Sequence, residues 1–263
     1  MTERLSDPDR VFDSNEILEV SILSVIGDRE EQQDSFGYEL GHTKGLIAVC
    51  DGMGGHLGGS LASNRAIETI LTEYKNSFSN DNIVGNLQAI IKRANEAVLK
   101  LTDSNGNSLR AGSTAVCVYI TGTKLYWNSV GDSRAYLFRN GEYVQITQDH
   151  NYRTVLKEQL NAGVIDRNIY DAEKVRGEAL ISYLGIGDLG LIDYNDSPVE
   201  LQQDDRILLM SDGLYKIVND QDICSIINNF NNIEEAIQAL ELKAKKHRNK
   251  KRDNMTVALI RIK

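Results

Sequence analysis

The chain has 263 residues, of which 41% are hydrophobic and 25% are charged, and it carries only 2 prolines. This composition is typical of a folded globular protein and excludes the disordered, collagen-like and disulfide-scaffold classes. The formal net charge of −9 argues against a general affinity for nucleic acid or for an anionic membrane, since basic side chains mediate both kinds of binding.

The sequence carries no pattern typical of a membrane span or a secretory signal. Its longest unbroken apolar run, Ala115 to Ile120, is far shorter than the roughly 20 residues that cross a bilayer. Cys50, Cys117 and Cys224 are odd in number and widely spaced, which indicates buried thiols in a reducing compartment. We therefore expect a soluble, cytoplasmic protein with no membrane or nucleic-acid partner, and we expect it to be a monomer.

The first half of the chain predicts strands followed by helices. Residues 1–15 are polar and predict a loosely held leader. Stretches rich in β-branched and apolar residues then predict three strands, and apolar residues at helical spacing predict two long amphipathic helices. The strands span 17–26, 35–40 and 45–50, and the apolar helical faces span 62–74 and 83–101.

The second half returns to alternating patterns with tight turn signals, which favours an antiparallel meander. Predicted strands span 114–121, 124–130, 133–139, 142–146, 180–184, 191–199, 206–210 and 255–262. Predicted helices span 152–160, 221–229 and 233–246, and a charge-rich irregular stretch spans 161–178. Antiparallel strands with helices inserted in pairs favour an α+β layered sandwich over a doubly wound parallel sheet. No linker rich in Pro, Gly or Ser interrupts residues 16–263, so we expect a single domain there.

Several aspartates lie at the ends or in the turns of predicted strands. A carboxylate at the buried edge of a sheet is costly unless a cation offsets its charge. Hard ions such as Mg²⁺ and Mn²⁺ bind carboxylates, carbonyls and water, and a glycine next to an Asp lets the main chain approach an ion. Any one of these aspartates also fits a turn or a cap, but the set favours a metal site. The set comprises Asp34, Asp51, Asp132, Asp149, Asp212 and Asp253.

These aspartates belong to short motifs that carry a family resemblance. In order, the motifs are Arg29 with Asp34, Asp51-Gly52-Met53-Gly54-Gly55-His56, Gly112-Ser113-Thr114, Val130-Gly131-Asp132-Ser133-Arg134, Asp149-His150, Ser211-Asp212-Gly213-Leu214 and Arg252-Asp253-Asn254. From about residue 20 onward the chain resembles the metal-dependent protein phosphatase family, type 2C, and in particular its bacterial serine/threonine phosphatase branch. The resemblance implies a four-layer α-β-β-α sandwich of two antiparallel sheets flanked by helix pairs, which agrees with the pattern of strands and helices.

The resemblance also implies a centre of two Mn²⁺ or Mg²⁺ ions at one edge of the sandwich. Asp51 would bridge the two ions, and the carbonyl of Gly52 would bind one of them. Asp212 and Asp253 would bind the other ion. Asp34 would act mainly by orienting metal-bound water.

The implied reaction is hydrolysis of phosphoserine or phosphothreonine by in-line attack of a hydroxide that bridges the two ions. Arg29 would clamp the substrate phosphate, since a planar guanidinium suits bidentate contact with phosphate. Asp132 corresponds to a family aspartate that binds a weaker third ion together with the aspartate matching Asp212. The substrates would be phosphorylated proteins, the products of a serine/threonine kinase. Segment 161–178 corresponds to the family's flap, and we expect its charges to select among those substrates.

The sequence departs from the family outside these metal ligands. Met53 stands where eukaryotic relatives often carry a His as candidate general acid, so protonation of the leaving group would fall to metal-bound water. Lys216 stands where many relatives carry an Asp near the third ion, and its ammonium would repel that ion. Gln32 replaces a usual Asn, and segment 181–185 replaces the Thr-Arg-Ala-Leu-Gly of bacterial relatives.

The same residues allow other interpretations. His56 and His150 fit packing roles, and Asp149 fits a cap for the helix that follows it. The basic residues of segment 243–252 fit either a solvated helix end or a docking site for acidic phosphoproteins or a kinase. Alternative functions are a phosphoprotein-binding module without turnover, hydrolysis of small phosphate esters or nucleic acid, and a nucleotide-binding loop at 54–59. The last of these lacks the lysine that a P-loop requires.

Overall fold

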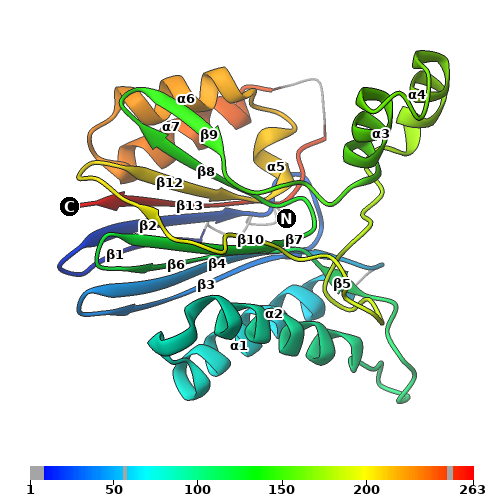
Figure 1. Cartoon of the computed structure of the whole chain (residues 1–263), viewed down its shortest axis with the longest axis horizontal. Helices are drawn as coiled ribbons and strands as arrows, with labels where there is room; N and C mark the ends of the chain where they lie inside the picture. The colour runs from blue at the N-terminus through cyan, green and yellow to red at the C-terminus, as the bar shows by residue number, and fades with distance from the viewer. Residues whose placement is uncertain (1–8, 56–57, 248–250) are drawn as a thin grey trace, which may run out of the picture.

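Two antiparallel sheets packed face to face form the centre of the molecule, and helices cover the outer side of each sheet (Figure 1). The structure is a computed structural model that describes residues 9–55, 58–247 and 251–263. The four layers confirm the predicted α+β sandwich of two antiparallel sheets flanked by helices.

The first sheet has 6 strands in the order β1-β2-β13-β12-β8-β9, and every neighbouring pair is antiparallel. Its strands are β1 (Asp9–Ser14), β2 (Leu18–Val25), β13 (Met255–Ile262), β12 (Arg206–Met210), β8 (Arg134–Arg139) and β9 (Glu142–Gln145). Strand β13 lies between β2 and β12, so segments from opposite ends of the described chain lie side by side.

The second sheet follows the path β10-β7-β6-β4-β3, with β11 also pairing with β7 and β5 with β4. Its strands are β3 (Asp34–Gly41), β4 (Lys44–Met53), β5 (Gly112–Ser113), β6 (Ala115–Thr121), β7 (Lys124–Val130), β10 (Asp193–Tyr194) and β11 (Val199–Glu200). Strands β4 and β6 are buried along most of their length because one face meets the first sheet and the other meets helices, which explains their continuous apolar runs.

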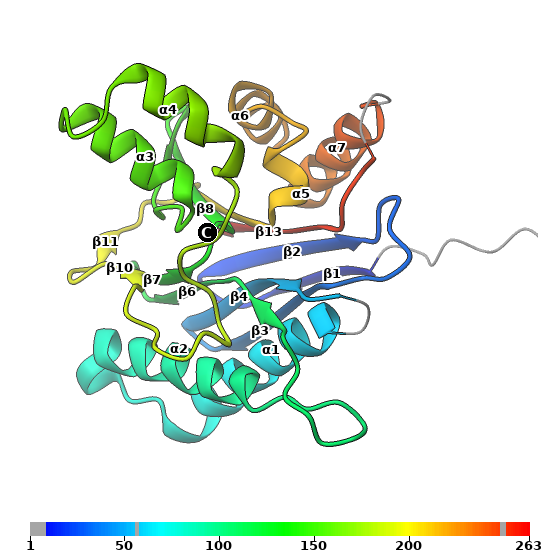
Figure 2. The same ribbon diagram turned by 90° about the vertical axis from the view of Figure 1, so that its right-hand side faces the viewer.

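Two sets of helices enclose the sheets. Helices α1 (Gly58–Ser77) and α2 (Ile83–Leu99) cover the second sheet, and α5 (Asp212–Tyr215), α6 (Asp220–Asn229) and α7 (Ile233–Lys245) cover the first. Helices α3 (Tyr152–Asn161) and α4 (Arg167–Glu173) stand beside the sandwich (Figure 2), and short 3-10 turns span Asn80–Asn82 and Lys174–Arg176. Within the described ranges, every helix is too short or too polar to cross a membrane.

Three apolar clusters fill the spaces between the four layers. The middle cluster lies between the sheets and includes Val20, Ile47 and Leu209. One outer cluster packs α1 and α2 on the second sheet, and the other packs α6 and α7 on the first. The middle cluster therefore fixes the position of one sheet relative to the other, which sets the geometry of any site built from both.

The prediction of a loosely held leader over 1–15 is wrong for the described part of that stretch. Residues 9–14 form β1, an edge strand in register with β2 from Asp9 opposite Ser24 to Ser14 opposite Glu19. Arg10 also forms an ion pair of 2.5 Å with the buried Glu241 of α7. An edge strand needs only one backbone partner, so a polar stretch with little apolar alternation can still join a sheet. Residues 1–8 lie outside the described residues.

Segment 161–178 and the stretch after it also differ from the prediction. Within 161–178 the chain forms α4, whose first turn is capped by Asp166 accepting a hydrogen bond of 2.9 Å from the Ile169 N–H. No residue of α4 is buried, so the helix leaves no apolar period in the sequence. The strand predicted at 180–184 is reduced to isolated bridges, and that at 191–199 to the short strands β10 and β11.

Candidate active site

Four of the aspartates singled out in the sequence lie at the same end of the sandwich. Asp34 begins β3 and lies in register with Asp51 of β4 in the second sheet. Asp212 follows β12 after one intervening residue, and Asp253 lies two residues before β13, which pairs with β12 in the first sheet. The Ser211 hydroxyl donates a 2.7 Å hydrogen bond to Asp34 Oδ2 and so connects the two groups.

Asp34 is the most deeply buried of these carboxylates, with a relative exposure of 5%. Its Oδ1 atom is buried and has no hydrogen-bond partner among the described residues. The pKa of Asp34 is raised from 3.8 to about 7, chiefly by burial; hydrogen bonding to Ser211 and Thr256 lowers it, and the charges of Asp212 and Asp253 raise it. A buried carboxylate oxygen without a hydrogen-bond donor is costly, and burial also disfavours the charged form of the carboxyl group. A nearby cation would relieve both costs.

The other carboxylates repel one another across the same space. Burial raises the pKa of Asp51 well above its usual range, and the charges of Asp34, Asp212, Asp132 and Asp253 raise it further. Burial, followed by the charge of Asp212, raises the pKa of Asp132 to about 6. Mutual repulsion of this kind is typical of a site that holds positive charge when it is occupied.

Two basic side chains lie on the outer carboxylates. Arg29 Nη2 is 2.5 Å from Asp253 Oδ2, and Lys216 Nζ is 2.5 Å from Asp212 Oδ2. Within the parts of the chain that the structure describes, no three His, Cys, Asp or Glu side chains are placed to hold one ion together. Binding of a divalent ion therefore requires Asp253 to share or release Arg29, and Asp212 to share or release Lys216.

The donor set nevertheless suits Mg²⁺ or Mn²⁺. Its side chains are carboxylates, which are hard oxygen ligands, and Oδ1 of Asp34 is available to a ligand or to a water molecule. The main chain at Gly52 is tightly enclosed, since an added Cβ would lie 2.0 Å from the Gly59 carbonyl oxygen. Only glycine fits there, which explains the residue type that follows Asp51.

Asn254 has a role that the sequence motif does not reveal. Its side chain accepts a 2.9 Å hydrogen bond from the Gln33 N–H and donates to the carbonyl oxygens of Ile26 and Glu31, at 2.8 and 3.0 Å. It therefore anchors the loop that carries Arg29 to the residue after Asp253. The signal was present only as the Asn that completes the Arg252-Asp253-Asn254 motif.

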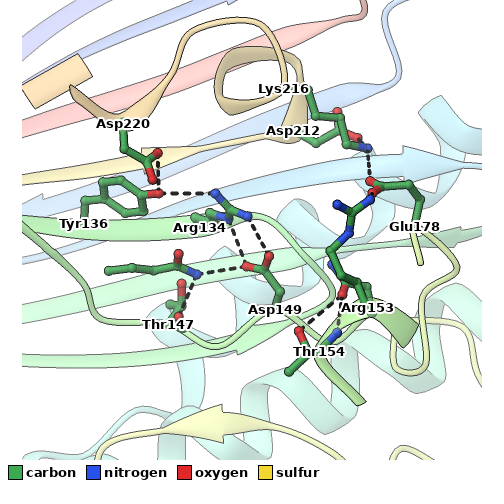
Figure 3. Close-up of polar contacts among 12 residues, drawn as sticks. Arg134, Tyr136, Thr147, Asp149, Arg153, Thr154, Glu178, Asp212, Lys216 and Asp220 are labelled. Carbon is green, nitrogen blue, oxygen red and sulfur yellow. Dashed lines mark hydrogen bonds and ion pairs between the residues drawn. The ribbon is translucent and has the colours of Figure 1, made fainter. Parts of the chain in front are cut away.

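The structure contradicts the predicted role of Asp149 and agrees with a structural role for His150. The predicted cap role of Asp149 is wrong, because Asn151 caps α3 by accepting from the Thr154 N–H, whereas Asp149 forms an ion pair of 2.7 Å with Arg134 (Figure 3). The Nδ1 atom of His150 accepts a 3.3 Å hydrogen bond from the Gly131 N–H, as befits a structural residue. His56 lies outside the described residues.

The basic segment 243–252 consists largely of paired cations where it is described. Lys243 lies 2.9 Å from Asp222, Lys245 lies 2.7 Å from Glu241, and Arg252 forms a 2.6 Å contact with Asp28. Residues 248–250 lie outside the described residues. Docking of an acidic partner at this segment stays a prediction.

Replacing Gly213 by alanine should destabilise the fold by about 2–4 kcal/mol, because the added Cβ would lie 1.9 Å from the Asn254 carbonyl oxygen. The clash lies between Asp212 and the segment that carries Asp253, so it also displaces the site. Urea unfolding measures the change. Gly187→Ala is the matched control, since no atom lies within 4 Å of its added Cβ. Equal unfolding midpoints for the two variants would contradict the expected clash.

Comparisons with known proteins agree with this arrangement. The model of the family described as Protein phosphatase 2C matches residues 13–155 and 196–255. The serine/threonine phosphatase stp of Listeria monocytogenes serotype 4b is 28% identical over 237 residues, which cover 88% of this chain and 90% of that protein.

Solved structures extend the likeness to the fold. The S. agalactiae serine/threonine phosphatase matches with a TM-score of 0.80 at 26% identity, over 94% of this chain and 100% of that chain. The catalytic domain of the serine/threonine protein phosphatase PstP, solved in complex with 2 manganese ions, matches with a TM-score of 0.74 at 27% identity, over 94% of this chain and 98% of that chain. The chain therefore belongs to the protein phosphatase 2C family and is a protein phosphatase.

Proposed function

We propose that this phosphatase removes phosphate from phosphoserine and phosphothreonine residues of proteins and that it requires two Mn²⁺ or Mg²⁺ ions. The observation that supports this best is the convergence of aspartates from both sheets around a buried carboxylate oxygen of Asp34 that has no partner in the described chain. Two such ions would supply a nucleophilic hydroxide near neutral pH and would offset the charge of the phosphoryl oxygens.

The family resemblance and the positions of the side chains support one assignment of the metal ligands. The charges of four other aspartates all act on the carboxyl of Asp51, which suits a role between the two ions. The carbonyl of Gly52 would hold one ion, and Asp212 and Asp253 would hold the other. Asp212 and Asp253 lie just outside the ends of β12 and β13 in the first sheet, and Asp51 lies in β4 of the second, so the centre would span the two sheets.

Asp34 and Arg29 act on water and on phosphate. The Ser211 hydroxyl holds Oδ2 of Asp34, which leaves Oδ1 to accept a proton or to orient a water molecule. The Arg29 side chain is half exposed and pairs with Asp253. We infer that Asp253 turns to an ion when the site fills and that the freed guanidinium then binds two phosphate oxygens.

The substrates and the cellular setting are part of the same proposal. Helices α3 and α4 form an arm beside the sandwich, and segment 161–178 makes up most of this arm. The charges of the segment largely pair with one another: Asp171 lies 3.2 Å from Arg167 and 2.9 Å from Lys174. These charges select among phosphorylated proteins, which are the products of a serine/threonine kinase. The phosphatase opposes that kinase in signalling, acts in the cytoplasm as a monomer, and uses residues 16–263 as one catalytic domain.

Hydrolysis of a phosphothreonine peptide tests the proposal. With Mn²⁺ or Mg²⁺ we expect turnover, and after removal of metal with a chelator we expect a rate at least roughly 100-fold lower, restored by adding the ion back. Release of inorganic phosphate measures both. A folded protein without turnover under any condition would favour a phosphoprotein-binding module. Turnover of p-nitrophenyl phosphate without turnover of phosphopeptides would favour a small-ester hydrolase.

A further inference from the structure

The Lys216 ammonium lies among carboxylates where the proposed metal edge meets the arm beside the sandwich (Figure 3). Its Nζ atom is 2.5 Å from Asp212 Oδ2 and 3.2 Å from Glu178 Oε2. Burial lowers the pKa of Lys216, but the charges of Asp212, Asp132 and Glu178 outweigh burial and raise it, so the side chain stays charged. The ammonium therefore contacts two carboxylates, Asp212 and Glu178, and also feels the charge of Asp132.

The short helix α5 holds this lysine beside Asp212. The Lys216 N–H donates a 3.0 Å hydrogen bond to the Asp212 carbonyl oxygen, so main chain and side chain both return to the same residue. The preceding residue, Tyr215, lies beneath the guanidinium of Arg134, whose carbon is 3.7 Å from the ring centroid. Arg134 follows the turn that contains Asp132, so this contact packs α5 against that turn.

Glu178 connects the same ammonium to the arm. One oxygen of Glu178 contacts Lys216, and the other accepts a hydrogen bond from Arg153 of α3. Glu178 follows the 3-10 turn Lys174–Arg176, which closes segment 161–178. A single lysine thus joins a proposed metal ligand to the segment beside the site.

We propose that Lys216 is a positioning residue that acts as a resident cation: its ammonium takes the place of a further metal ion among Asp132, Asp212 and Glu178, and it fastens segment 161–178 to Asp212. This inference rests on the proposed function, since it treats Asp212 as a ligand of the two catalytic ions. It replaces the weaker third ion that the family resemblance implies for Asp132. A covalently attached cation is always present, so the position of the segment is independent of the free metal concentration.

Counting bound ions in Lys216→Asp tests the first part of the proposal. This substitution removes the ammonium and adds a carboxylate, so Asp132, Asp212 and Glu178 are left without a cation. Native mass spectrometry and calorimetric titration with Mn²⁺ should therefore find two ions in the wild type and three in the variant. Lys174→Asp is the matched control, because it makes the same change of charge on a lysine of segment 161–178 that contacts only Asp171 among described carboxylates. The control should bind two ions.

Neutral and conservative variants test the second part and protect against a misfolded Lys216→Asp. Lys216→Gln removes a positive charge beside Asp212, so Mn²⁺ should bind roughly threefold or more tightly while the number of ions stays at two. Amide hydrogen exchange in 161–178 should become faster, because Glu178 loses one partner. Lys216→Arg keeps the charge and should restore both wild-type exchange and wild-type affinity.

The possible failures are distinguishable. Three ions in the wild type, two ions in a folded Lys216→Asp, or unchanged affinity and exchange in Lys216→Gln would each overturn the role of Lys216 and leave the two-ion proposal intact. A folded wild type that binds no Mn²⁺ at all would overturn the proposed function itself, and the role of Lys216 with it.

Discussion

Replacing Asp212 by asparagine is expected to lower kcat/KM for a phosphothreonine peptide by about 10³-fold or more at saturating Mn²⁺. The amide is neutral and a poorer ligand for a hard ion than a carboxylate. The Lys216 ammonium, 2.5 Å from Asp212 Oδ2 in the wild type, also loses its nearest counter-charge and adds to the repulsion of an incoming ion. Steady-state release of phosphate over a range of Mn²⁺ concentrations measures the loss.

Asp222→Asn provides the matched control for that experiment. Asp222 is likewise an acidic residue in the first turn of a helix, and it forms an ion pair of 2.9 Å with Lys243. It belongs to α6, outside the aspartate group, so its substitution should leave kcat/KM within about twofold of the wild type. If Asp212→Asn retained activity within tenfold of the control, Asp212 would not be a ligand of the catalytic ions.

Replacing Asp34 by asparagine is expected to stabilise the metal-free protein while it lowers activity. The native fold holds this carboxyl with a pKa of about 7 against 3.8 for the exposed group, so an ionised Asp34 costs stability above pH 7. The difference between these two pKa values corresponds to about 4 kcal/mol, which the neutral amide avoids while it still accepts the hydrogen bond from Ser211. Urea unfolding in the presence of a chelator at pH 8 measures the gain.

The pH dependence of the metal-free protein follows from the same shift. Between about pH 4 and pH 7 the native state binds more protons at Asp34 than the unfolded state does, so stability falls as pH rises through this window. The gain from Asp34→Asn should therefore be large at pH 8 and small at pH 4. Asp222→Asn should give no gain at pH 8, since Lys243 lowers the pKa of Asp222. An equal gain from Asp34→Asn at both pH values would show that the gain does not come from avoiding a buried ionised carboxylate.

The layered architecture could be predicted from the sequence because its signals are local. Strand β13 begins and ends where the apolar alternation of 255–262 predicts, and β7 spans the predicted 124–130. Strand β1 and helix α4 leave no such signal, since β1 depends on backbone pairing with β2 and α4 buries no residue. Elements that are held by the rest of the molecule, rather than by their own apolar faces, are the ones that the sequence does not predict.

In the candidate site, too, the features with a local sequence signal could be predicted and those that depend on distant segments could not. The aspartates could be singled out because each belongs to a short motif beside a strand, and the structure brings Asp34, Asp51 and Asp212 to one edge. The partners of these residues could not be predicted, because they come from distant segments. The contact of Glu178 with Lys216 and the Asn254 anchor on the loop after β2 depend on tertiary packing and have no periodic signature.

The hydrogen bond from Ser211 to Asp34 has a further consequence, because it crosses from one sheet to the other. An ion held by Asp51 and by Asp212 would cross-link the same two sheets at their common end. Its affinity would then depend on the spacing of the sheets, which apolar side chains such as Ile47 and Leu209 maintain without being ligands themselves. Selection for catalysis would thus act on the volume of the middle apolar layer, and an enlarged or reduced side chain there would change metal affinity without touching the site.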